Sequence, residues 1–397
     1  MYLSHISYHE TTVDHGGSQE WRLQGLDLGP INLIVGKNSA GKTRVTNLIT
    51  VLGQMLAGKI TPQFSSGSWY AEFERMKGQA REVQQYHLEV NERVISKEAF
   101  SIGKQSIMGR TADGNCFVLR KAGSERVKYK VPTNQLTAVV RRDEIQHPFF
   151  EHIYQWGLSL CTYRFGSDFG KSSATIVTPA TGGEEQFSAA DQVDNAVHVF
   201  RKTFEKFGAL FRDEVLADLH ELGYPCTDIT LNVIQGFAFN GVPPLVLAVK
   251  EHDLARYTSQ AEMSQGMYRA LALCIHVNAN ILWAQDKQRG RELRLGDLPM
   301  VIIDDIGEGL DFDRARRLIA GLIRKAQKNH IQLVMSSNDR FIMNDVPLEY
   351  WTVLHRKGGT VRAFNAKNSK KAFEEFEYLG MNNFDFFSGE HFLENQE

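Results

Sequence analysis

The chain has 397 residues, of which 42% are hydrophobic and 23% are charged, and its formal net charge is −2. This composition is typical of a globular protein with a large core, and the balanced charge excludes a global electrostatic attraction to nucleic acid or to an anionic membrane. Four scattered cysteines without a C-x-x-C pair, a polar N-terminus and the lack of a long apolar run predict a cytoplasmic protein with no disulfide framework, zinc site or membrane partner.

The first functional signal is a strand, a glycine-containing loop and a helix. The β-branched run Ile31 to Val35 predicts a buried strand, and apolar residues recur at helical spacing after residue 44. Between them lies the pattern G-x-x-x-x-G-K-[ST]. Its glycines let the backbone N–H groups curl around phosphates, its lysine reaches the outer phosphates and its hydroxyl binds Mg²⁺. The pattern therefore predicts ATP and Mg²⁺ binding by Gly36, Lys37, Asn38, Ser39, Ala40, Gly41, Lys42 and Thr43.

A long insert follows this loop. Residues 82–130 alternate in the manner of strands and contain the turn signal ADGN, whereas residues 148–158 and 194–223 have helical patterns. The segment 166–186, rich in Gly, Ser and Thr, predicts a mobile polar loop. No long heptad pattern predicts an extended coiled coil. In the second helical stretch, an apolar stripe is predicted to be core rather than a ligand site: Val197, Phe200, Phe204, Phe207 and Leu210.

A second helix-start signal lies near residue 264. Ser264 is placed as an N-cap before a helix with Leu271, Cys274 and Ile275 on one face. A helix that opens with Ser-Gln-Gly presents a hydroxyl, free N–H groups and a positive dipole end to an anion. Taken alone, simple capping is the favoured explanation of the serine, but the carboxylate strand that follows supports an anion site.

The segment "LPMVIIDD" predicts a strand that is covered on both faces and ends in Asp304 and Asp305. Carboxylates at this end of a strand lie where α/β folds bind ligands, and Asp304 is the predicted Mg²⁺ acceptor. A helix over 311–329, a strand over 331–337 and a turn over 338–341 follow. This alternation predicts an α/β domain.

In this order, GKNSAGKT, MSQGMYR, VIIDDIGEGLD and SSND resemble the motifs of an ABC-type ATPase head, in the variant found in RecF, SMC-like and OLD-family proteins. The resemblance covers residues 1 to about 53 and about 259 to 365. It implies an α/β fold, with a mixed or parallel sheet flanked by helices and an inserted β-rich and helical region. It also implies a head-to-tail dimer, in which the signature of one molecule closes on the nucleotide of another.

The resemblance assigns roles residue by residue. Asp304 matches the Mg²⁺ carboxylate together with Thr43, and Asp305 occupies the position of the catalytic glutamate. Residues 309–311 match the loop that follows this position. The signature is matched by Ser264, Gln265 and Gly266, with Arg269 where soluble relatives often have a basic residue.

Two departures from the family pattern bear on catalysis. Asp305 is one methylene shorter than glutamate, and Glu308 compensates only if the turn folds back. Asn338 stands where many relatives have a histidine that senses the γ-phosphate; its amide donates a hydrogen bond but carries no charge. Together they predict slow or conditional hydrolysis, with Asp305, Glu308 and Asn338 as the catalytic group.

The sequence predicts five segments. They are an ATPase lobe with the phosphate loop (1–70), a β-rich insert (71–175), a helical region with linking strands (176–255), a signature lobe (256–365) and an aromatic, acidic tail (366–397). The tail is expected to pack on its own domain, with an interaction segment as the alternative. A basic cluster is interpreted as a solvated face, with nucleic-acid contact as the alternative: Arg356, Lys357, Arg362, Lys367, Lys370 and Lys371.

The leading hypothesis is an ATPase that forms a homo-oligomer around ATP and controls a separate effector, a nuclease or toxin, as antiphage relatives do. The chain carries no nuclease-like set of acidic and histidine residues of its own. A DNA-repair ATPase and a non-hydrolysing, ATP-dependent scaffold stay open as alternatives. A transporter subunit fits poorly because of the large insert and the missing histidine.

Overall fold

The computed structural model describes residues 1–14, 17–77, 80–120, 125–176, 187–236, 238–287, 299–377 and 379–393. The chain divides into two compact units, each built from segments that are distant in the sequence. Unit 1 comprises Met1–Leu160, Arg294–Met300 and His330–Glu397, and unit 2 comprises Cys161–Leu293 and Val301–Asn329.

The core of unit 1 is a group of parallel strands around β3 (Ile31–Gly36), in which every residue is buried. β15 (Gln332–Ser337) pairs in parallel with one side of β3, and β16 (Trp351–Lys357) with the other. Strands covered on both faces need apolar side chains on both faces, which explains why β3 is apolar apart from Asn32, whose buried amide donates to backbone carbonyls. The carboxyl end of β3 leads directly into the phosphate loop.

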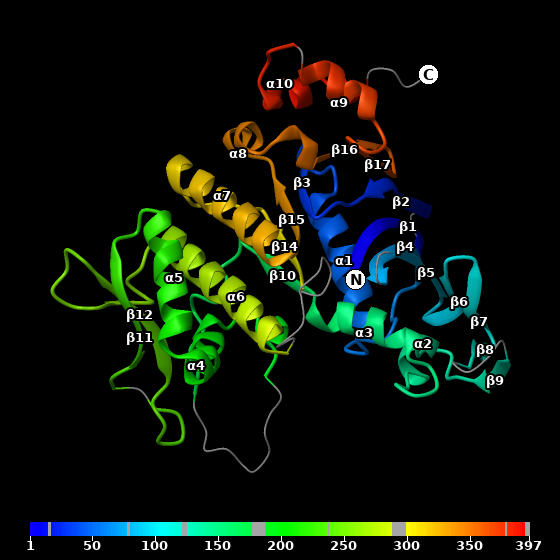
Figure 1. Ribbon diagram of the computed structural model, residues 1–397, viewed down its shortest axis with the longest axis horizontal. Helices are drawn as coiled ribbons and strands as arrows, with labels where there is room; N and C mark the ends of the chain where they lie inside the picture. The colour runs from blue at the N-terminus through cyan, green and yellow to red at the C-terminus, as the bar shows by residue number, and fades with distance from the viewer. Residues whose placement is uncertain are drawn as a thin grey trace. The chain divides into compact units, whose positions relative to one another are not determined.

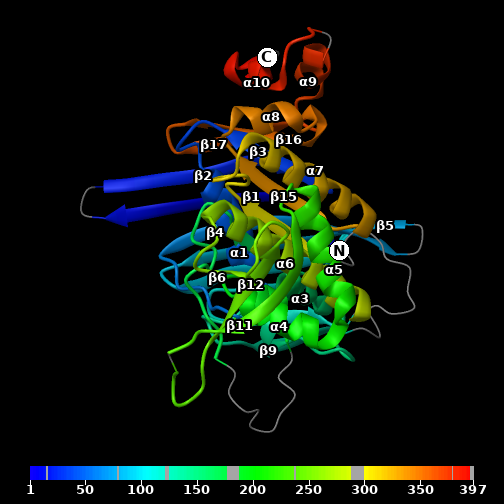
Figure 2. The same ribbon diagram turned by 90° about the vertical axis from the view of Figure 1, so that its left-hand side faces the viewer.

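The sheet of unit 1 continues from β16 as a mixed and then antiparallel array. β17 pairs antiparallel with β16 and parallel with β2, and β1 and β2 form the long hairpin seen in Figure 2. The later strands run as a meander, as the sequence predicted for the β-rich insert. These strands are β17 (Thr360–Asn365), β2 (Gly17–Asp27), β1 (Tyr2–Asp14), β4 (Ser66–Lys77), β5 (Ala80–Asn91), β6 (Val94–Ile102), β7 (Gln105–Thr111), β8 (Asn115–Leu119) and β9 (Arg126–Lys130).

The helices of unit 1 include α1 (Lys42–Leu56) and α3 (Phe149–Ser159). The two helices approach closely at Gly157, where an added Cβ would lie 2.3 Å from the Gly53 carbonyl oxygen. The C-terminal segment, defined as the described residues 370–377 and 379–393, lies beside α8 in Figure 1. Phe373, Phe376, Phe386 and Phe392 are buried there, so the expected packing of the tail on its own unit is confirmed. The remaining helices are α2 (Thr137–Val140), α8 (Arg340–Asp345), η2 (Leu348–Tyr350), α9 (Lys370–Glu377), α10 (Asn383–Ser388) and η3 (His391–Leu393).

Unit 2 is built around α6 (Gln265–Lys287), whose residues 266–281 are all buried. β10 (Cys161–Arg164) and β14 (Met300–Asp304) pair in parallel, and α4 and α5 pack on α6 (Figure 1). β11, β12 and β13 form a separate antiparallel sheet. The other elements are η1 (Ala189–Asp191), α4 (Ala196–Phe207), α5 (Ala209–Glu221), β11 (Cys226–Val233), β12 (Leu245–Glu251), β13 (Thr258–Ser259) and α7 (Phe312–Asn329).

The predicted apolar stripe of unit 2 is only partly core. Val197 and Phe200 are buried, but Phe204 is 39% exposed and Leu210 is 58% exposed. Gly208, with φ 57°, ends α4 and starts α5, so the helical spacing does not continue across it. The prediction that Phe204 and Leu210 share a buried face is therefore wrong.

The polar segment 338–341, predicted as a turn, instead opens α8. The side chain of Asp339 accepts hydrogen bonds from the N–H groups of Phe341 and Ile342 and so caps the helix.

Among the described residues, no helix has a stretch long and apolar enough to cross a bilayer.

Candidate nucleotide-binding and hydrolysis site

The phosphate loop joins β3 to α1 in unit 1. Gly41 precedes the helix with φ 105°, a conformation that a side chain would strain. No side chain caps the helix, and its first turn contains no acidic residue. The positive dipole end of α1 therefore favours an anion and meets no acidic side chain in the first turn. Gly36 is also constrained, because an added Cβ would lie 3.0 Å from the Ala40 Cβ.

Lys42 and Thr43 open α1. Lys42 is buried, and its Nζ donates to the carbonyl oxygen of Gly36 at 2.9 Å, so the ammonium is held across the mouth of the loop. The side chain of Thr43 is exposed. A held ammonium and an exposed hydroxyl at a helix start suit the terminal phosphates and the metal ion of a nucleotide.

Asn338 lies beside the phosphate loop, and its role as a γ-phosphate sensor stays a prediction. It follows β15, which is parallel to β3, and parallel strands end at the same edge of a sheet. Its Nδ2 donates to Oδ1 of Asn38 at 3.0 Å. An amide thus occupies this position, and it can donate to a phosphate without adding charge.

The predicted signature lies at the start of α6 in unit 2. Ser264 caps it, since the N–H of Met267 donates to Ser264 Oγ at 3.2 Å. Gly266 is required by close approach: an added Cβ would lie 2.5 Å from the carbonyl oxygen of Gly309. The start of the helix is thereby packed against the loop that follows β14. Gln265 donates from Nε2 to the carbonyl oxygen of Asp168 at 3.1 Å.

Arg269 organises this region from inside unit 2. The residue is 9% exposed, and its guanidinium donates to three backbone carbonyl oxygens. Nε donates to Ser167 at 2.9 Å, Nη1 to Glu308 at 2.8 Å and Nη2 to Gly166 at 2.7 Å. The side chain is therefore used within its own unit, and nucleotide binding by Arg269 stays a prediction.

Acidic residues gather at the end of β14 and in the turn after it. Asp304 is 4% exposed, whereas Asp305 is half-buried and adopts the left-handed conformation with φ 53°. A Cβ placed on Gly166 would lie 2.4 Å from Glu308 Oε2 and 3.3 Å from Asp305 Cβ. The turn thus folds the Glu308 carboxylate back towards Asp305, which is the condition under which Glu308 can compensate for the short aspartate.

The donors predicted for Mg²⁺ fit that ion by type. Thr43 and Asp304 supply a hydroxyl and a carboxylate, and Mg²⁺ prefers oxygen ligands while keeping waters and substrate phosphates in its shell. Within the described ranges, no three His, Cys, Asp or Glu side chains gather to hold a metal by themselves. Thr43 and Asp304 stay the predicted Mg²⁺ ligands.

The segment after β10 was missed as part of the site. Its residues 166–173 belong to the segment predicted to be mobile. Side chains of the signature region donate hydrogen bonds to carbonyl oxygens in this segment, and its mobility stays a prediction. Tyr268 donates to Gly170 at 3.0 Å, and Lys171 Nζ donates to the Met263 carbonyl at 2.7 Å. The rest of the loop, 177–186, lies outside the described residues.

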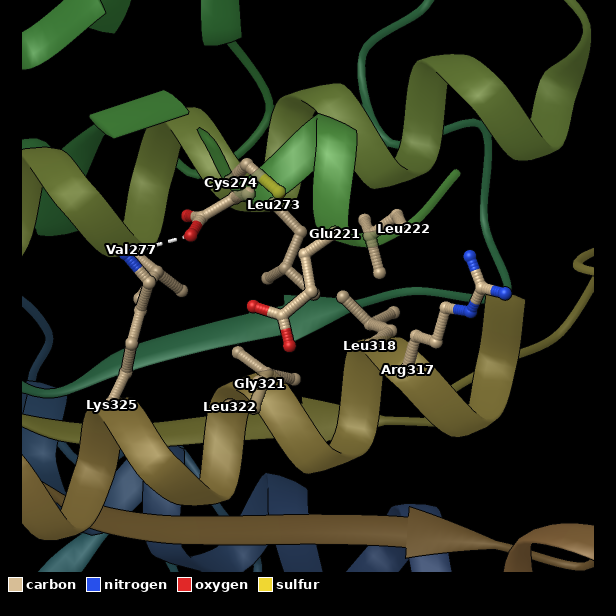
Figure 3. A pocket seen from close by; sticks show the side chains of 11 residues that line it. Glu221, Leu222, Leu273, Cys274, Val277, Arg317, Leu318, Gly321, Leu322 and Lys325 are labelled. Atoms are coloured by element: carbon tan, nitrogen blue, oxygen red, sulfur yellow. Dashed lines mark ion pairs between the residues drawn. The ribbon is translucent and has the colours of Figure 1, made fainter. Parts of the chain in front are cut away.

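A buried polar cluster was also missed, and it lies away from the signature loop in unit 2. Lys325 Nζ is 3.0 Å from Asp218 Oδ1 and 2.7 Å from Asn278 Oδ1. Burial raises the pKa of the Asp218 carboxyl, and the nearby Lys325 opposes that shift. Figure 3 shows Lys325 beside a narrow, mainly apolar pocket with Leu273 and Val277. The cluster joins α5, α6 and α7.

Comparisons with known proteins identify a family for this chain and structures with a similar fold. A family model described as "AAA domain, putative AbiEii toxin, Type IV TA system" matches residues 31–344. No curated protein matches the chain. The crystal structure of an Smc head bound to the C-winged helix domain of ScpA has 12% identity and a TM-score of 0.52, covering 91% of this chain and 97% of that one.

Two further Smc head structures are similar at lower TM-scores. One, from Pyrococcus furiosus, was solved with an extended coiled coil and the C-terminal domain of ScpA; it has 10% identity, a TM-score of 0.49 and coverage of 95% and 99%. The other, from Thermotoga maritima, has 11% identity, a TM-score of 0.41 and coverage of 92% and 99%. The family match and the fold of the first structure confirm the predicted α/β head, and the chain belongs to the AAA-domain, putative AbiEii toxin family.

Proposed function

We propose that this protein binds Mg·ATP between the phosphate loop of one molecule and the signature helix of a second, and that the resulting dimer controls a separate effector. The formed phosphate loop is the observation that carries the proposal. Lys42 is held across the loop, Gly41 adopts the required left-handed conformation, and the start of α1 is uncapped. These features suit a triphosphate without further rearrangement.

Hydrolysis is proposed to be slow or conditional. Asp305 and Glu308 are two carboxylates beside Gly166, and either one accepts a proton from an attacking water or orients it. Asp305 is short, and Glu308 is exposed on a turn. Asn338 donates to phosphate but adds no positive charge. Thr43 and Asp304 would hold Mg²⁺, which neutralises charge on the phosphates when it is bound.

Control of an effector rests on two considerations. The description of the family names a putative toxin of a toxin–antitoxin system, which supports a role in defence or growth control. The chain itself carries no nuclease-like set of acidic and histidine residues, so a nuclease or toxin activity would come from a partner. DNA repair and a non-hydrolysing scaffold are the competing functions.

The first experiment measures ATP turnover and oligomeric mass together, with Mg²⁺, for wild type, Lys42→Ala, Asp305→Asn, Glu308→Gln and the double carboxamide variant. We expect ATP to shift wild type from monomer to dimer and Lys42→Ala to stay monomeric. We expect turnover to fall partially in each single carboxamide variant and to be lost in the double variant.

The outcomes separate the candidate functions. Assembly on ATP without turnover, with intact nucleotide recovered from the dimer, would favour the scaffold. Turnover that rises many-fold on adding DNA would favour the repair ATPase. A wild type that neither binds ATP nor assembles would overturn the proposal.

A further inference from the structure

The outer turn of the phosphate loop contains a strained residue. Residues 37–40 form a turn closed by the N–H of Ala40, which donates to the Lys37 carbonyl at 3.0 Å. Ser39, third in this turn, has φ 65°. A positive φ at this position is usually supplied by glycine or asparagine, and the left-handed conformation costs another residue about 1 kcal/mol. Such strain persists only when neighbouring groups hold the backbone in place.

The neighbouring group is Arg356, at the end of β16. Its Nη1 donates to the carbonyl oxygen of Ser39 at 3.2 Å, and its Nε donates to the Gly358 carbonyl at 2.9 Å. The first contact joins residues 317 positions apart in the sequence. The guanidinium is planar, so the second bond fixes the orientation of the first. Arg356 therefore bonds the backbone of the strained residue itself.

A second contact holds the same turn from the C-terminal segment. Lys37 Nζ lies 2.6 Å from Glu390 Oε1. Glu390, Phe387 and Phe392 line a surface pocket together with Arg356 and residues 37–40. Both partners of this ion pair are exposed to water, so the pair contributes little at physiological salt. Arg356 is exposed as well, but its bond acts on the backbone of the strained residue and therefore constrains the turn directly.

We propose that Arg356 is a positioning residue for nucleotide binding: it holds the left-handed turn at Ser39 and thereby keeps the phosphate loop in its anion-binding conformation. This inference rests on the proposed function. It assigns one member of the basic cluster to the loop rather than to nucleic acid. It also assigns Ser39 a backbone role, because a glycine at that position would adopt the same conformation without help.

The experiment compares the Kd of a fluorescent ATP analogue, with Mg²⁺, for wild type, Arg356→Gln, Ser39→Gly and the double variant. Arg356→Gln should bind about threefold to fivefold more weakly, which corresponds to about 0.7–1 kcal/mol. Ser39→Gly should bind at least as well as wild type. The double variant should match Ser39→Gly, because glycine removes the strain that Arg356 opposes. The matched control is Arg362→Gln, an exposed arginine on the neighbouring strand β17.

Arg356→Gln and Ser39→Gly effects that simply add would overturn the proposal, because Arg356 would then act on the nucleotide or elsewhere. Hydrogen exchange of the nucleotide-free chain supplies an independent readout. Arg356→Gln, but not Arg362→Gln, should raise exchange of the Ala40 amide, which donates to the Lys37 carbonyl, and unchanged exchange there would also overturn the proposal. If wild type and Lys42→Ala both fail to bind nucleotide, the proposed function fails, while the exchange result still decides the role of Arg356.

Discussion

The phosphate loop and the signature region are built in different ways, although both surround a helix start. In the phosphate loop, Lys42 bonds Gly36, six residues away, and the turn at 37–40 closes on itself. In the signature region, Arg269 bonds Gly166, Ser167 and Glu308, which are 103, 102 and 39 residues away. A local site is encoded by a short motif, so its mutation should impair ligand binding. A site made of distant segments is part of the fold, so its mutation should cost stability first.

Both regions nevertheless store strain beside the predicted chemistry. Ser39 and Asp305 each adopt a positive φ that is rare for residues other than glycine. Ser39 is held by a side chain, Arg356, whereas Asp305 lies in a turn with the left-handed glycines Gly307 and Gly309 nearby. We therefore expect substitutions in the phosphate loop to affect mainly nucleotide binding, and substitutions in the signature region to affect mainly the free energy of unfolding. Both quantities can be measured on the same variants.

The largest effect is expected in the phosphate loop. Lys42→Ala removes the ammonium that the loop holds, and turnover should fall by about 10²–10³-fold, as when one preorganised donor is removed from a charged transition state. The free energy of unfolding without nucleotide should change by less than about 1 kcal/mol. Steady-state ATPase assays and urea unfolding measure the two quantities. A large loss of stability would show that the motif is not local.

The next largest effect is expected in the signature region, which is built from segments that are distant in the sequence. Arg269→Ala leaves three carbonyl oxygens without their buried donor and should lower the free energy of unfolding by about 3 kcal/mol. Arg269→Lys should recover part of this loss, because an ammonium still donates to one or two of the oxygens. Denaturant unfolding checks both variants. An Arg269→Ala chain of wild-type stability with lost ATP binding would instead place Arg269 on the nucleotide.

A smaller effect is expected when a side chain is added where α6 contacts the loop after β14. Gly266→Ala puts a methyl group 2.5 Å from the Gly309 carbonyl oxygen and should destabilise the fold by about 2 kcal/mol. The matched control is Gly321→Ala in α7, where an added Cβ would meet no atom closer than 3.8 Å. That change should be neutral or stabilise by up to about 1 kcal/mol. Equal thermal shifts for the two variants would contradict the close approach.

The last effect is a pH dependence that belongs to unit 2. His276 packs on Tyr163 and Phe169, has no hydrogen-bond partner for either ring nitrogen among the described residues, and burial lowers its pKa to about 3. Because the folded-state pKa lies below the unfolded value of about 6.5, its contribution is complete above pH 6.5 and is lost as pH falls towards 3.

The variant His276→Phe tests this contribution. The difference in unfolding free energy between wild type and the variant should change by about 1.4 kcal/mol per pH unit below pH 6.5. Urea unfolding at pH 7, 6 and 5 measures it. Parallel curves for the two proteins would show that His276 does not stay neutral when buried.

The sequence by itself determined those features that depend on neighbouring residues. The run Ile31 to Val35 has an apolar side chain at nearly every position, which is enough to bury a strand, and the glycines and lysine that follow specify the loop. The β-rich insert and the strand that ends in Asp304 were equally readable, because alternation and apolar runs are local signals.

The tertiary structure decided what no local pattern carries. The three oxygens that Arg269 bonds belong to segments whose proximity arises only when β10 and β14 pair, and a backbone carbonyl leaves no mark in a sequence. Gly208 ended a helix that spacing alone continued, and Glu308 folded back because positive-φ residues bend its turn. The bond from Arg356 to Ser39 has the same origin: hydrogen bonds between distant residues depend on how the chain packs, and residue types do not specify it.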